Sequence, residues 1–105
     1  MSIIESDDNH LRKYIFEKEK VIVKFVDDDC PVCKTLAPSF KELATEPRFQ
    51  DIAFLRMHAA ENPVSRKEVK LTGTPFFATY KKGRLQECGV VATEEGVRHM
   101  LLKLK

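Results

Sequence analysis

Residues 21–33 read VIVKFVDDDCPVC, an apolar segment followed by three aspartates and two closely spaced cysteines. Residues 21–26 are rich in β-branched side chains and apolar on both faces except at Lys24, which predicts an interior strand of a sheet covered on both sides. Pro31 suits the first position of a helix, where its missing N–H costs nothing. The sequence therefore places the two cysteines where a strand ends and a helix begins.

Cys30 and Cys33 have the placement that is typical of reactive thiols. A cysteine at a helix N-terminus faces unpaired N–H groups and the positive end of the helix dipole, and both stabilise a thiolate. Two intervening residues let one helical turn bring the sulfurs close enough to form a disulfide. We expect Cys30, the more exposed sulfur, to attack a substrate disulfide and Cys33 to resolve the mixed disulfide.

Two other interpretations of the pair stay open. Both cysteines could be small apolar residues with a structural role, or they could form half of a zinc site. Zinc would need two more ligands. The candidates are Cys88, His10, His58 and His99, and none shows ligand-like spacing.

The rest of the chain alternates between helical and strand-like patterns. Apolar residues at helical spacing predict helices from the caps at residues 6–8 to about Lys18, over 31–45 with a kink at Pro38, after Asn62-Pro63, and after the Thr93 cap. Further strands are predicted over 52–57, 75–81 and 84–91, the last two joined by the Lys82-Gly83 turn. This alternation predicts a single α/β domain over residues 1–105 with a mixed sheet.

Composition and charge exclude several classes of protein. The 105 residues fit one domain, and Leu, Ile, Val and Phe number 30 of them, too many for a disordered chain. The apolar runs are far shorter than the roughly 18 residues of a membrane span, so no membrane association is expected. A net charge of +2 is no basic footprint, so we expect no nucleic acid partner.

Cysteine usage and the first residues bear on the compartment. Three cysteines are too few for a disulfide scaffold, and the start MSIIESDD has no basic region and no long apolar segment. We therefore expect a reducing, cytoplasmic location, although a chain trimmed of a signal would look the same. Cys88 is expected to be a buried structural residue. A regulatory or dimerising thiol is the less favoured alternative.

Gly73-Thr74-Pro75 lies at the start of a predicted buried strand. A proline there removes a donor from the sheet, so it needs a reason, and a cis peptide bond before Pro75 is one. An ordinary trans turn proline is the alternative. A cis bond would set the Thr74 backbone beside the cysteines, free to pair with an extended substrate.

Taken together, these motifs resemble the thioredoxin family from about Asp8 to the end of the chain. The resemblance is carried by the strand before the cysteines, Cys33-Lys34, Ala37-Pro38, Asn62-Pro63, Gly73-Thr74-Pro75, Lys82-Gly83 and Gly89. It implies a thioredoxin fold, in which helices flank a central mixed sheet on both faces. It also implies thiol–disulfide oxidoreductase activity without a bound cofactor.

The family resemblance further assigns roles to individual residues. Cys30 would be the nucleophile, Cys33 the resolving cysteine, and Pro75 a cis proline at the substrate groove. Pro31, Val32 and Thr74 would line that groove with it. The resemblance implies disulfide-containing protein substrates and a thioredoxin reductase that keeps the pair reduced, and we expect a monomer.

Two departures from the family pattern surround the cysteines. Pro31-Val32 replaces the usual Gly-Pro, a dipeptide that tunes the redox potential, so the direction of catalysis stays open. Asp29 stands where the family usually has a tryptophan. Together with Asp27 and Asp28 it would raise the pKa of Cys30 by like-charge repulsion, unless the three aspartates are only a solvated turn.

Lys24 is the most consequential departure, because the family usually has a buried aspartate there that handles the proton of the resolving thiol. Arg56, in the predicted second strand, falls where the family commonly has a lysine. Burying two cations together away from water costs much free energy. We therefore expect that Lys24 either reaches solvent or a nearby aspartate, or that it is neutral with a depressed pKa. Either Lys24 and Arg56 tune the thiols, with Lys24 stabilising the Cys33 thiolate, or Lys24 extends to solvent and takes no part.

The favoured function is therefore reduction of protein disulfides through a dithiol–disulfide cycle of Cys30 and Cys33. One alternative is a binding or scaffold module that kept the fold with little turnover, which the missing Asp and Trp favour. Another is a more oxidising or isomerase-like member, consistent with the altered dipeptide.

Overall fold

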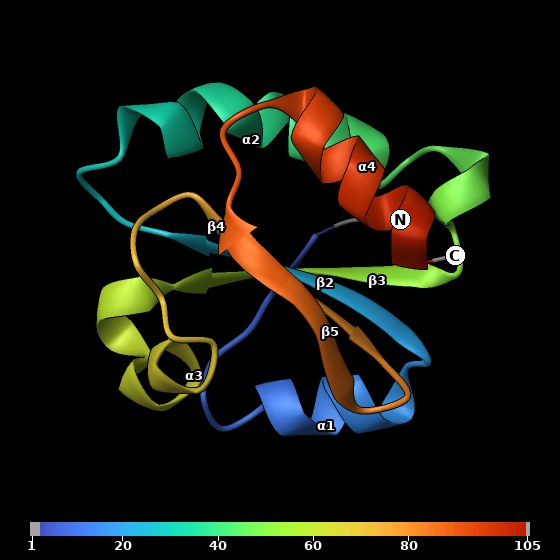
Figure 1. Cartoon of the computed structure of the whole chain (residues 1–105), viewed down its shortest axis with the longest axis horizontal. Coiled ribbons are helices and arrows are strands. Elements are labelled where there is room, and N and C mark those ends of the chain that lie inside the picture. The colour runs from blue at the N-terminus through green and yellow to red at the C-terminus, as the bar shows by residue number, and fades with distance from the viewer. Residues whose placement is uncertain (1–2, 105) are drawn as a thin grey trace.

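The computed structural model of the chain describes residues 3–104, which fold around a five-stranded sheet in the order β1-β3-β2-β4-β5 (Figure 1). The strands are β1 (Ile4–Glu5), β2 (Lys20–Val26), β3 (Ile52–His58), β4 (Phe76–Lys81) and β5 (Arg84–Val90). The helices are α1 (Leu11–Glu17), α2 (Pro31–Leu43), α3 (Pro63–Glu68) and α4 (Glu94–Leu104), with single 3₁₀ turns η1 (Pro47–Phe49) and η2 (Ala59–Glu61). β1, β3 and β2 are parallel, whereas β4 and β5 form an antiparallel hairpin beside β2. The predicted mixed sheet is confirmed.

Two helices cover each face of the sheet: α2 and α4 lie on one side, and α1 and α3 on the other (Figure 1). Successive side chains of β2 alternate between the two layers. Ile22 packs with α2 and α4, whereas Val21 and Val23 pack with α1, and all three are fully buried. The prediction of an interior strand covered on both sides is therefore confirmed. Within the described part of the chain, no helix is long and apolar enough to cross a membrane.

The predicted capping of the first helix is partly wrong. The Asp7 carboxylate accepts a hydrogen bond from the backbone N–H of His10 (3.0 Å), just before α1. Asp8 instead accepts from the N–H groups of Val64 (3.1 Å) and Ser65 (2.8 Å), at the start of α3. The sequence offered a local helix for Asp8 to cap, but the fold brings the N-terminus of a distant helix to it.

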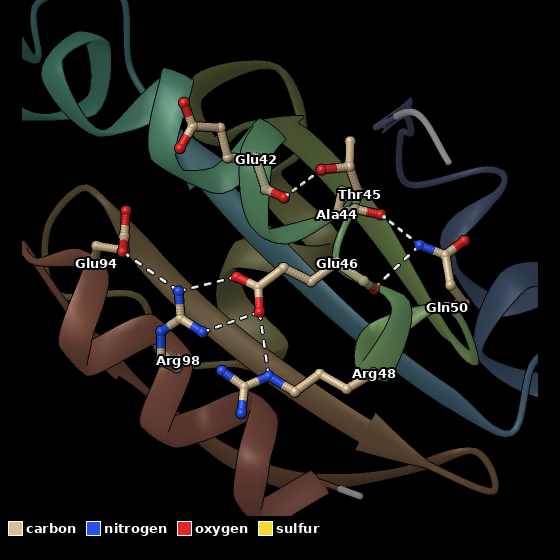
Figure 2. A network of polar contacts seen from close by, with 8 residues as sticks. All are labelled: Glu42, Ala44, Thr45, Glu46, Arg48, Gln50, Glu94 and Arg98. Atoms are coloured by element: carbon tan, nitrogen blue, oxygen red, sulfur yellow. Dashed lines mark hydrogen bonds and ion pairs between the residues drawn. The ribbon is translucent and has the colours of Figure 1, made fainter.

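The end of α2 is fastened to α4 by a network of polar contacts (Figure 2). Glu46 follows α2, and its two carboxylate oxygens accept hydrogen bonds from the Arg98 guanidinium of α4 at 3.0 and 2.9 Å. Arg48 donates to the same carboxylate at 3.1 Å. The hydrogen bonds from Arg98 hold the pKa of Glu46 below its ordinary value. The contacts anchor α2 at the end opposite its cysteines.

Gly83 occupies the β4–β5 turn with a backbone that disfavours other residues. Its φ is 80°, in the left-handed region, and a Cβ built there would lie 2.7 Å from the Phe16 ring. We expect Gly83→Ala to lower the free energy of unfolding by about 1 kcal/mol or more, as measured by urea denaturation. Gly89→Ala is the matched control, because a Cβ there meets nothing within 4 Å. Equal effects of the two substitutions would contradict this reason.

Candidate active site

Cys30 and Cys33 form a disulfide at the start of α2, with their Cα atoms 5.2 Å apart. Cys30 is the N-cap of α2 and Pro31 its first residue, as the sequence predicts. The backbone N–H of Cys33 donates a hydrogen bond to the Cys30 sulfur (3.1 Å). Both residues are buried in this oxidised form, and Cys30 is only marginally the more exposed (6% against 4%). The helix N-terminus therefore presents a donor to the Cys30 sulfur.

The strand register brings the Thr74-Pro75 segment to the same edge of the sheet as the cysteines. β2 and β4 are antiparallel neighbours with Phe25 opposite Phe76, so β4 begins where β2 ends. The Thr74–Pro75 peptide bond is cis, which confirms the prediction. Pro75 itself is buried and Thr74 is half-buried. The Thr74 backbone therefore lies at the end of the sheet where β2 finishes and the chain continues into α2.

The residues around the disulfide present two different surfaces. Pro31 is exposed and Val32 has 42% of its surface exposed, an apolar surface between the two cysteines. Asp27, Asp28 and Asp29 are all exposed in the turn before them. The aspartates therefore form a solvated turn, and their effect on the pKa of Cys30 stays a prediction.

Lys24 projects from β2 into the layer beneath α2 and is only 1% exposed. Its Nζ donates a hydrogen bond to the backbone carbonyl of Cys33 (3.1 Å) and lies 5.6 Å from the centre of the Phe40 ring. The alternative in which Lys24 extends to solvent is therefore wrong, as is a direct contact with an aspartate. Burial, followed by repulsion from Arg56, lowers the pKa of Lys24 from 10.5 to about 8, so the pKa is depressed as expected but the side chain is still mostly protonated at pH 7 and not neutral.

Arg56 lies beside Lys24, but its side chain is partly exposed where that of Lys24 is buried. The two residues are register partners on β2 and β3. The Arg56 side chain is 43% exposed and its guanidinium is paired with Glu5 of β1. Its Nε is buried and has no hydrogen-bond partner among the residues that the structure describes. The structure thus brings both predicted cations to the α2 side of the sheet, with Lys24 the nearer to the cysteine backbone.

A pocket of about 300 Å³ opens beside Cys33. Its lining comprises Lys24, Val26, Asp27, Asp28, Cys33, Lys34, Ala37, Arg56 and His58. His58 had no predicted link to the cysteines, yet it shares this pocket and lies 3.7 Å from the Asp28 carboxylate. The available signal was the strand period: Arg56 and His58 are two residues apart and so share one face of β3. The pocket gives solvent a path to Lys24 and Cys33.

Lys24→Met tests how strongly the buried charge is disfavoured. The folded pKa lies below the unfolded value, so the folded state is destabilised while Lys24 is protonated, and this effect fades as the pH rises from about 8 toward 10.5. We expect the variant to be more stable than the original chain by roughly 2–3 kcal/mol at pH 7, with most of that difference gone by about pH 10.5. Urea unfolding followed by far-ultraviolet circular dichroism measures both values.

Lys20→Met is the control for that experiment, because Lys20 is on the same strand and paired with Asp51 (3.1 Å). Its substitution leaves the buried charge in place, so the rise in stability with pH should persist. A stability difference between Lys24→Met and the original chain that is the same at both pH values would contradict the depressed pKa.

Cys88 is exposed, so the expectation of a buried structural residue is wrong. It lies on β5, an edge strand whose residues are all at least partly exposed. Its sulfur lies 3.7 Å from the carbonyl oxygen of Val69, far along the chain from Cys30 and Cys33.

Over residues 3–104, no group of three or more His, Cys, Asp or Glu side chains gathers as metal ligands would.

A family model and individual protein sequences both match this chain to thioredoxins. The family model described as Thioredoxin matches residues 2–102. A thioredoxin of Geodia cydonium is 31% identical over 86 residues, which cover 81% of this chain and 79% of that protein. A thioredoxin H-type of Brassica campestris is 30% identical over 101 residues, 95% of this chain and 80% of that protein.

Solved structures show the same fold. Thioredoxin F from spinach chloroplast superposes with a TM-score of 0.90 at 20% identity, covering 98% of this chain and 93% of that one. Mitochondrial thioredoxin 3 from Saccharomyces cerevisiae, in its oxidised form, has a TM-score of 0.89 at 23% identity, with 97% and 95% covered.

Proposed function

Because the chain belongs to the thioredoxin family and carries the paired Cys30 and Cys33, it is a thiol–disulfide oxidoreductase, and we propose that it reduces disulfides in proteins. The observation that carries this proposal is the position of the disulfide at the N-terminus of α2, with Val32 exposed between the two cysteines and the cis Thr74–Pro75 segment at the same end of the sheet. A disulfide that only stabilised the fold would not require a position at a helix N-terminus, nor a neighbouring backbone segment that a substrate can reach.

The proposed cycle begins with the reduced pair. The Cys30 thiolate attacks one sulfur of the substrate disulfide, a Cys30–substrate bond forms, and the other substrate sulfur leaves as a thiolate. Cys33 then attacks the Cys30 sulfur, re-forms the Cys30–Cys33 bond and releases the second substrate thiolate. Two electrons pass from the pair to the substrate. The N–H of Cys33, which already donates to the Cys30 sulfur, stabilises negative charge on the attacking atom.

The substrate would bind across Pro31, Val32, Thr74 and Pro75. Val32 offers an exposed apolar contact next to the reacting sulfurs. The Pro75 carbonyl already accepts a hydrogen bond from the N–H of Val91 (3.2 Å), so the Thr74 backbone is the part of this segment best suited to pair with an extended substrate.

The proposed setting is a reducing one. An exposed, unpaired Cys88 supports a reducing compartment, and we keep the cytoplasm as the proposed location. A thioredoxin reductase would return the pair to its dithiol form, as family members require an electron source for repeated turnover. We propose that the protein works as a monomer, which size-exclusion chromatography with and without reductant would test.

Turnover of a protein disulfide is the test of this function. The rate is measured first with dithiothreitol as the electron donor and then with a thioredoxin reductase system. We expect catalysis above the uncatalysed reaction in both. No rate above background with either donor would reject the reductase and favour the alternative of a binding or scaffold module.

A further inference from the structure

The buried ammonium of Lys24 has no carboxylate partner among the described residues, although charged groups surround it. Those lining the two pockets that reach Lys24 are Glu5, Asp27, Asp28, Lys34, Lys41, Arg56 and His58. Glu5 is engaged by Arg56, and Asp28 lies beside His58. What touches the Lys24 ammonium instead is the carbonyl of Cys33 and the face of Phe40. A charge in that position is left largely uncompensated while the pair is a disulfide.

The missing negative charge becomes available when the disulfide opens. In the mixed disulfide, Cys30 is bonded to the substrate and Cys33 is free to ionise, and the Lys24 Nζ is held at the backbone of that same residue. An opposite charge within about 4–6 Å favours the ionised form of an acid. Lys24 is 1% exposed, so water screens the attraction between its ammonium and a Cys33 thiolate less than it would on the open surface, although a pocket reaches both residues.

We propose that Lys24 is a positioning residue for the resolving step: its ammonium stabilises the Cys33 thiolate that attacks the mixed disulfide. The inference rests on the proposed dithiol–disulfide cycle and deepens it. The Cys33 thiol loses its proton to solvent through the pocket it shares with Lys24 and His58. Its thiolate then bonds to the Cys30 sulfur, and the Cys30–substrate bond breaks with the electron pair going to the substrate sulfur.

This arrangement couples the protonation of Lys24 to the redox state. The ammonium favours the Cys33 thiolate, so by reciprocity the thiolate favours the ammonium, and reduction raises the pKa of Lys24 above the value of about 8 found in the disulfide form. Stabilising the reduced pair also makes the disulfide easier to reduce, which shifts its reduction potential upward.

The test isolates Cys33 in a chain with Cys30→Ser and Cys88→Ser, which leaves one titrating thiol and no exposed competitor. The ultraviolet absorbance of the thiolate and the rate of alkylation are followed against pH. In this background we expect Lys24→Met to raise the Cys33 pKa by about one unit or more. Lys24→Gln, which keeps a polar side chain but no charge, should do the same. Circular dichroism confirms that each chain is folded.

Lys20→Met is the matched control, since it removes a lysine from the same strand at the end remote from the cysteines. Its Cys33 titration should be unchanged. In chains that keep both active cysteines, Lys24→Met should lower the reduction potential by about 30 mV for each tenfold change in the thiolate equilibrium. An unchanged thiol titration in both Lys24 variants would overturn the inference.

The two proposals fail in different ways. If the original chain has no turnover with either electron donor, the proposed function fails whatever Lys24 does to the thiol. If the original chain turns over and Cys33 titrates alike with and without the Lys24 charge, only the inference about Lys24 fails.

Discussion

Cys33→Ser is expected to stop the cycle at the mixed disulfide and to reduce turnover by on the order of 10³-fold or more. Cys30 remains at the N-cap of α2, where the neighbouring backbone N–H stabilises its thiolate, so the first attack still occurs. Serine cannot form a disulfide with Cys30, and the substrate therefore stays attached. Mass spectrometry under non-reducing conditions should show the variant plus one substrate chain.

Cys88→Ser is the control, because Cys88 is exposed on the edge strand and touches neither cysteine of the pair. Its turnover should match that of the original chain. The proposed division of roles would be wrong if Cys33→Ser turned over normally, or if the trapped substrate were attached at Cys88.

Phe40→Ala is expected to have the largest effect on stability, a loss of about 3–5 kcal/mol in the free energy of unfolding. Phe40 is 1% exposed and joins α2 to the sheet, with its ring centre 5.2 Å from that of Phe54 and 5.5 Å from that of Phe77. The substitution would leave a cavity and would also remove the aromatic ring over which the Lys24 ammonium lies. Such a loss is a large share of the 5–15 kcal/mol that is ordinary for a domain.

Urea denaturation of the oxidised protein, followed by far-ultraviolet circular dichroism, measures this loss. A backbone signal is chosen because the chain has no tryptophan to report unfolding by fluorescence. Phe16→Ala is the control of equal chemistry, because Phe16 is 68% exposed and should cost at most about 0.5 kcal/mol. Similar losses from the two substitutions would contradict the central packing role of Phe40.

The alternating pattern of the sequence was enough to predict the sheet and the place of the reacting cysteines. The apolar run of β2, the Cys30-Pro31 junction and the proline before β4 each have a local physical signature, and the structure confirms all three. β1 was missed because a strand of two residues has no period to detect. Its significance lies in Glu5, which engages Arg56.

The surroundings of individual side chains were harder to predict, because they depend on which segments the fold brings together. Cys88 was expected to be buried, but β5 lies at the edge of the sheet, and no element within residues 3–104 covers it fully. His58 reaches the pocket beside Cys33 only through the register of β3 against β2. Of the environments considered for Lys24, burial with a depressed pKa agrees with the structure, but a pKa of about 8 leaves the side chain mostly protonated at pH 7 and not neutral. The hydrogen bond to Cys33 could not be read from the sequence.

The position of Lys24 also bears on the direction of electron flow. A cation that stabilises the reduced pair shifts the potential toward that of an oxidant, and Pro31-Val32 between the cysteines is a further departure from the family pattern. A shift of about 30 mV per tenfold change in thiolate stability is small against the range between reducing and oxidising members of this chemistry. We therefore expect Lys24 to raise the reduction potential of the reductase without raising it into the range of an oxidant.

The reduction potential of the Cys30–Cys33 pair tests the proposed reductase most directly. The protein is equilibrated in glutathione or dithiothreitol buffers of known potential, the free thiols are alkylated, and the fractions of dithiol and disulfide are counted by mass spectrometry. We predict a reversible two-electron couple between about −270 and −200 mV. A value well above about −200 mV would contradict the reductase and indicate an oxidant or isomerase.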